Sequence, residues 1–174
     1  MLSTLWTDED IAAANAAFQK RFPAGRGMGV WTASADGTRE WAGTSKGLSS
    51  LDTRHPIKNN AEYHGMELYA WQFMATAQYE DAFEHFYSAA LWRESDHDQI
   101  EASNPNAGGD SGHVKAIDMC IRMARFARAL WSAQINNAPY PPTSDFDLDE
   151  AWVARREAKA EQALSAAMSG LPGD

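Results

Sequence analysis

Apolar side chains recur at three- and four-residue intervals along most of the chain, which is the pattern of amphipathic α-helices. This pattern predicts helices over residues 7–21, 61–94, 113–136 and 147–168. The second region fits either one long helix or two helices that are separated by a break near Gln78. We therefore expect a mainly α-helical fold, a compact bundle of four to five helices in a single domain over residues 1–174.

Local signals divide the rest of the chain. Thr7 followed by Asp10 is a variant of the capping box and predicts the start of the first helix. Short β-favouring runs on both sides of a turn predict a small N-terminal β-hairpin over residues 27–42. Gly, Ser, Pro and Asn residues predict an irregular connection over 43–60 and a loop over 95–112.

Composition limits the class of protein. Hydrophobic residues make up 44% of the chain, as in globular proteins, and the single Cys120 allows neither an intrachain disulfide nor a cysteine-based zinc site. The N-terminal residues lack the pattern of a signal peptide, and no apolar run approaches the roughly 20 residues that cross a bilayer. We expect a cytoplasmic protein without a membrane association.

The formal net charge of −9 is concentrated in one region. Residues 62–110 contain ten acidic residues and one basic residue, Arg93. Direct binding to nucleic acid requires clustered Lys and Arg, so this balance disfavours it. Basic protein surfaces and metal ions are the better partners.

Aromatic residues accompany the acidic ones in this region. Their number exceeds what one helix face can bury, which favours either a helix in the middle of the bundle or a contact with a second molecule, including another copy of the chain. The second alternative predicts an acidic interaction surface. Its candidate residues are Glu80, Glu84, Trp92, Glu94, Asp96, Asp98 and Glu101.

Paired carboxylates also suggest a metal site. Asp81 and Glu84 lie three residues apart, so a helix presents them on neighbouring turns, and carboxylate oxygens are the ligands that Mg²⁺ favours. Asp118 adds a third oxygen if the 113–136 helix packs antiparallel. The alternative is that the acids of the first helix are solvated and that Asp118 pairs with Arg122 or Lys115.

The run from Ile117 to Met123 (IDMCIRM), which follows an acidic amphipathic helix, resembles the second metal-binding helix of the MazG-like all-α nucleotide pyrophosphohydrolases. The resemblance covers about residues 66–130. It implies a four-helix site that holds Mg²⁺ with two acidic pairs, at which Asp81, Glu84 and Asp118 are the matching acids. Gln78 and Lys115 stand where the family has acidic ligands.

Two functions follow from these observations. The first is a non-enzymatic, acidic interaction module without a cofactor or catalytic residues, comparable to accessory or inhibitor proteins of phages and mobile elements that bind a basic protein surface. The second is a divergent, Mg²⁺-dependent MazG-like hydrolase that converts nucleoside triphosphates to monophosphates and pyrophosphate. Only this second function requires a metal ion.

Overall fold

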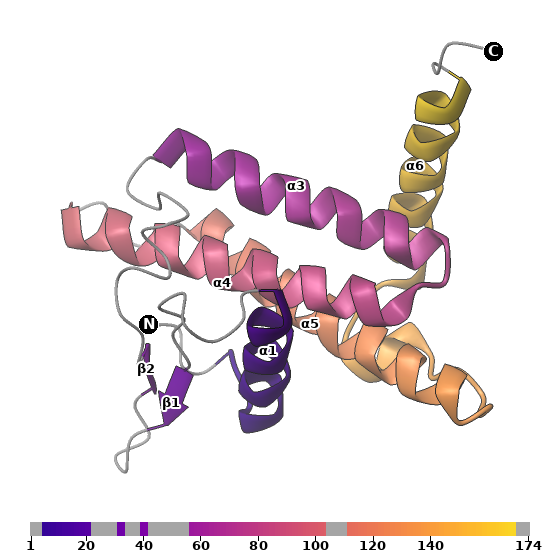
Figure 1. Cartoon of the computed structure of the whole chain (residues 1–174), viewed down its shortest axis with the longest axis horizontal. Coiled ribbons are helices and arrows are strands. Elements are labelled where there is room, and N and C mark those ends of the chain that lie inside the picture. Colours follow the sequence, from indigo (N-terminus) through magenta and orange to yellow (C-terminus); the bar gives the residue numbers. More distant parts are fainter. Residues whose placement is uncertain (1–4, 22–30, 34–38, 42–55, 104–110, 170–174) are drawn as a thin grey trace.

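The computed structural model describes residues 5–21, 31–33, 39–41, 56–103 and 111–169, and it is mainly helical. The helices form a compact bundle (Figure 1). Their bounds are α1 Asp8–Arg21, α3 Pro56–Ala75, α4 Tyr79–Ser103, α5 Ser111–Ile135 and α6 Glu150–Ser169, with a 3₁₀ turn, η1, at Thr143–Phe146.

Two short strands lie between α1 and α3 in the sequence. β1 (Trp31–Ala33) pairs antiparallel with β2 (Arg39–Trp41), with Trp31 opposite Trp41. The residues that connect the strands, and those that flank them within 27–42, lie outside the described residues. The hairpin as a whole therefore stays a prediction.

The first helix begins as the sequence predicts. The hydroxyl oxygen of Thr7 accepts a hydrogen bond from the backbone N–H of Asp10 at 3.2 Å, and a carboxylate oxygen of Asp10 accepts one from the N–H of Thr7 at 2.8 Å. These reciprocal bonds form a capping box, which satisfies two backbone donors near the helix start. The helix then continues to Arg21, where the prediction ends it.

The break near Gln78 is real, so the two-helix alternative is correct. Ala77 adopts a left-handed conformation with φ of 57°. The N–H of Ala77 bonds to the carbonyl of Met74 at 3.1 Å, and that of Gln78 bonds to the carbonyl of Phe73 at 2.8 Å. This pair of bonds is a Schellman motif, which ends α3 and reverses the chain into α4.

Two predicted boundaries are wrong. Pro56 begins α3 instead of belonging to the irregular connection predicted over 43–60, because the first helical position does not need the N–H that proline lacks. The predicted loop over 95–112 is helical as far as Ser103, because residues 95–103 contain neither proline nor glycine and continue α4, which packs along α5. Residues 104–110 lie outside the described residues.

The core of the bundle lies around α4. Helix α4 packs between α3 and α5 and runs antiparallel to both, while α1 lies against α4 and α6 packs on α3 (Figure 1). The C-terminal part of α6 extends beyond the other helices (Figure 1). The described helices include none with the length and apolar character that a bilayer crossing demands.

Candidate functional site

Three of the predicted interaction residues face inward. The Trp92 side chain is 1% exposed and Glu94 is fully buried, where its carboxylate accepts a 2.6 Å hydrogen bond from the indole N–H of Trp6. Glu84 is buried as well and pairs with Lys20 of α1 at 3.0 Å. These side chains hold α1 and the N-terminal segment against α4, so the prediction that they belong to an accessible surface is wrong.

The other predicted interaction residues divide into two groups. Glu80 is about half exposed, at 48% of its side chain, and lies 3.5 Å from Lys20. The backbones of Asp96, Asp98 and Glu101 belong to α4, and their side chains lie outside the described residues. For these three residues the surface role stays a prediction.

The aromatic rings of α4 fill the interior. Phe83, Phe86 and Tyr87 are buried along with Trp92, and Phe86 meets Trp71 of α3 edge to face with ring centroids 5.3 Å apart. The excess of rings in this region thus serves a helix that has neighbours on several sides. Of the two alternatives that the sequence leaves open for these rings, burial in the middle of the bundle is confirmed.

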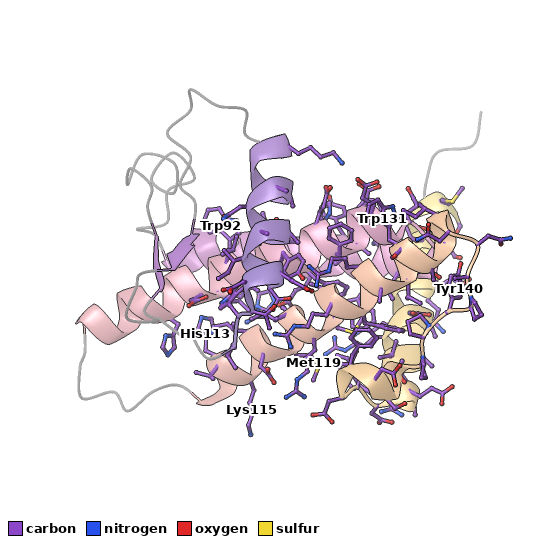
Figure 2. All side chains as sticks on the ribbon, turned by 90° about the horizontal axis from the view of Figure 1, so that it is seen from below. Trp92, His113, Lys115, Met119, Trp131 and Tyr140 are labelled. Atoms are coloured by element: carbon purple, nitrogen blue, oxygen red, sulfur yellow. The ribbon has the colours of Figure 1, made fainter. Side chains whose placement is uncertain are left out.

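Two of the three predicted metal ligands pair with basic side chains. Asp118 pairs with Arg122 one turn along α5 at 2.7 Å, as the non-metal alternative predicts, while Glu84 is held by Lys20. Lys115 points away from the helices (Figure 2). In the part of the chain that the structure describes, no three His, Cys, Asp or Glu side chains are grouped so as to hold a metal ion. Asp81, Glu84 and Asp118 are therefore not brought together as a ligand set.

The arginines of α5 are directed mainly toward α1. Arg125 donates from its Nε and Nη2 atoms to the buried carboxylate of Asp10 at 2.7–3.1 Å, and the hydroxyl of Tyr87 donates to the same carboxylate at 2.8 Å. Burial raises the pKa of Asp10, but the hydrogen bonds from Arg125, Thr7 and Tyr87 outweigh burial and lower this pKa below 3.8. Asp10 is therefore an ionised, structural carboxylate that joins three helices.

A cavity of about 130 Å³ lies among four helices on the other side of the core. Side chains one or two turns apart converge on it: Glu67 and Trp71 from α3, Phe86 and Arg93 from α4, Ala116, Met119, Cys120 and Met123 from α5, and Trp152 and Arg156 from α6. The lining is mostly aromatic and sulfur-containing, with charged groups at a few positions. This combination is typical of binding sites for small molecules.

The charged groups inside the cavity compensate one another. Arg93 donates through Nε to the carboxylate of Glu67, and its guanidinium lies 4.2 Å from the ring centroid of Tyr63. The thiol of Cys120 donates to the same Glu67 oxygen at 3.2 Å. Burial, together with the negative charge of Glu67, raises the pKa of Cys120 well above its usual value. Cys120 is thus a neutral thiol, not a nucleophile.

Arg156 has a different environment. It is exposed, and its guanidinium lies 5.3 Å from the ring centroid of Trp152 at the α6 side of the cavity. Within the described part of the chain it forms no ion pair, in contrast to Arg93. Arg156 therefore provides a positive charge that remains available where the cavity meets solvent.

Sequence reasoning missed this site. One signal was present, because Arg93 is the only basic residue in the acidic region and directly follows the apolar run Ala89–Trp92. A lone cation in such a position needs a buried partner. The sequence could not identify the partner, since Glu67 lies 26 positions away on another helix.

Comparison of the chain with protein-family models, with curated proteins and with solved structures finds no match.

Proposed function

We propose that the chain is a non-enzymatic interaction module that binds a basic protein surface, and that the segment between α5 and α6 makes the contact. The observation that carries the proposal is the exposure of both apolar and acidic side chains in this segment. Tyr140 is 54% exposed, Asp145, Asp149 and Glu150 are exposed as well, and Ile135, the last residue of α5 and adjacent to the segment, is 61% exposed.

The charge of this segment supports a basic partner. Residues 136–150 contain four acidic residues and no Lys or Arg. Asp147 is engaged by Arg122 at 3.3 Å, whereas Asp145, Asp149 and Glu150 form no ion pair with any residue that the structure describes. The segment thus keeps a local negative charge, which favours association with a positively charged surface and makes the association sensitive to salt.

The apolar residues of the segment can supply binding energy that charged residues alone do not. Aromatic and aliphatic anchors contribute most of the binding energy in many protein interfaces, and charged residues at the rim contribute specificity and association rate. The ring of Tyr140 packs against the ring of Tyr79, with ring centroids 5.7 Å apart. Tyr140 is nevertheless 54% exposed. It is therefore positioned as an anchor with a fixed orientation.

The test compares two triple variants of the full chain in pull-down experiments from host lysate at low and high salt. The first neutralises the segment with Asp145→Asn, Asp149→Asn and Glu150→Gln. The control removes the same charge elsewhere with Asp8→Asn, Glu80→Gln and Glu161→Gln, all at exposed positions. We expect a basic protein that the wild type and the control capture at low salt and that the segment variant loses.

The captured protein is then purified and titrated against the same three chains. Equal affinity for both variants would refute the segment as the contact surface, and capture that persists at high salt would refute the electrostatic part of the proposal. Light scattering of the isolated chain reports whether a second copy of the chain occupies the surface instead.

The alternative, a divergent MazG-like pyrophosphohydrolase, depends on Asp81, Glu84 and Asp118 around Mg²⁺. Lys20 and Arg122 already compensate two of these carboxylates. We therefore expect no pyrophosphate from any deoxynucleoside triphosphate with Mg²⁺ or Mn²⁺. Release that Asp118→Asn abolishes would restore the alternative, and Asp145→Asn serves as the matched control.

A further inference from the structure

We propose that the cavity among α3, α4, α5 and α6 binds a small aromatic carboxylate, with its ring inside the cavity and its carboxylate at Arg156. The site is separate from the α5–α6 segment, so this inference is independent of the proposed interaction function. Three properties of the cavity define the ligand: its size, its lining and its charge.

The size of the cavity admits one ring. Its volume of about 130 Å³ is close to that of engineered apolar cavities of roughly 150 Å³, which bind benzene. Arg156 of α6 lines the cavity and is exposed, so a substituent on the ring can extend toward solvent beside it. The volume therefore matches the single ring of a benzoate-sized ligand.

The lining favours an aromatic ring over an aliphatic chain. Trp71, Phe86 and Trp152 contribute aromatic rings, and Met119 and Met123 contribute thioethers, which make favourable contacts with aromatic rings. Trp71 and Trp152 pack edge to face with ring centroids 5.4 Å apart, which fixes the shape of one wall. The ring of a ligand would thus contact the aromatic rings and thioethers that line the cavity.

The charges favour an anion over a cation. Glu67 is already neutralised by Arg93 and also accepts the thiol hydrogen of Cys120, so it offers little to an incoming ammonium group. Arg156 already lies over the ring of Trp152, so a second cation at that face would be repelled by its charge. The two arginines and one glutamate leave a single net positive charge on the lining, and Arg156 carries it.

The experiment titrates the full chain with sodium benzoate, benzamide and benzylamine at constant ionic strength. The readout is the shift of the methionine Cε methyl signals, assigned with Met119→Leu and Met123→Leu. We expect saturable shifts of these two signals with benzoate at a Kd on the order of 1 mM. Benzamide should bind about tenfold more weakly, and benzylamine more weakly still.

Matched arginine variants test the role of charge. Arg156→Gln should weaken benzoate binding about tenfold and leave benzamide binding unchanged, because it removes a charge-assisted contact. Arg155→Gln removes the neighbouring exposed charge, which does not line the cavity, and should change neither. Ala116→Leu should reduce the binding of both ligands by filling the cavity.

Several results would overturn the inference. These are the absence of saturable shifts at Met119 and Met123, equal affinities for benzoate and benzamide, and equal effects of the two arginine variants. If Ala116→Leu fails to fold, the methionine assignments and the arginine pair still decide whether the ligand binds in this cavity and through Arg156.

Discussion

Replacing Asp10 by alanine should destabilise the fold more than any other single acidic substitution in α1. The Asp10 side chain is fully buried and accepts hydrogen bonds from the Thr7 N–H, the Tyr87 hydroxyl and the guanidinium of Arg125. Asp10→Ala leaves the Tyr87 hydroxyl without its acceptor, leaves the Arg125 guanidinium with only the Leu5 carbonyl, and removes half of the capping box. Breaking a buried ion pair in this way costs about 3–5 kcal/mol.

The size of this loss of stability follows because a buried polar group without a partner costs more free energy than its hydrogen bond contributes. A lost cap alone costs about 1 kcal/mol, and each buried donor left without an acceptor costs about 1–3 kcal/mol. Because Arg125 is 30% exposed, water recovers part of its loss, which favours the lower half of the range. Asp10→Asn keeps an acceptor oxygen and should therefore cost less than Asp10→Ala.

The assay is equilibrium urea unfolding followed by circular dichroism and tryptophan fluorescence, with Asp8→Ala as the control. Asp8 is exposed and belongs to the same helical turn, so its removal should change the free energy of unfolding by no more than about 0.5 kcal/mol. A loss of less than about 1 kcal/mol in the free energy of unfolding for Asp10→Ala, or equal losses for both variants, would refute the conclusion that the buried hydrogen bonds of Asp10 stabilise the fold.

The pH dependence gives a second test of the same residue. The pKa of Asp10 is lowered in the folded chain, so ionised Asp10 stabilises the fold fully above its unfolded pKa of about 3.9. This contribution is lost as the pH falls from that value through the lower folded pKa. The difference in stability between wild type and Asp10→Asn should therefore shrink over this acid range and stay constant above about pH 5.

Three further predictions concern the core and the turns. Trp92→Ala should lower the free energy of unfolding in urea by about 3–5 kcal/mol because Trp92 is buried. Ile135 is exposed, so Ile135→Ala should lower it by less than about 0.5 kcal/mol, and similar losses for both variants would contradict the burial of Trp92. Cys120, with its raised pKa, should react with a disulfide reagent at pH 8 far more slowly than in denaturant, and equal rates would disprove its burial. Ala77→Gly should raise the unfolding free energy by about 0.5–1 kcal/mol because glycine adopts the left-handed conformation without strain, and a loss of stability would show that this conformation is not strained.

Local chemistry accounts for the parts of the fold that were predicted correctly. The Thr7 and Asp10 capping box needs only residues three apart, and the helical repeat of α5 needs only its own sequence. The errors at Pro56 and at residues 95–103 occurred where one residue type fits two local structures. Proline both interrupts and begins helices, and a polar run without glycine or proline forms a helix once another helix packs against it.

The candidate sites were predicted less well, because spacing along one helix does not say which side is buried. Glu80 and Glu84 are one turn apart, yet the first is half exposed and the second is buried against Lys20 of α1. The chain position of α1 is known from the sequence, but its placement on α4 is not. An acidic surface on α4 was therefore predicted with buried residues among its members.

The sequence by itself determined a mainly helical chain, the capped start of its first helix and the excess of negative charge, because each depends on residues within a few positions of one another or on composition alone. Only the tertiary structure decided that Asp10 meets Arg125, that Glu67 meets Arg93 and Cys120, and that four helices line a cavity beside Arg156. These contacts join residues that lie far apart in the chain, and the energies that select them come from packing and burial, which no local pattern of residues specifies.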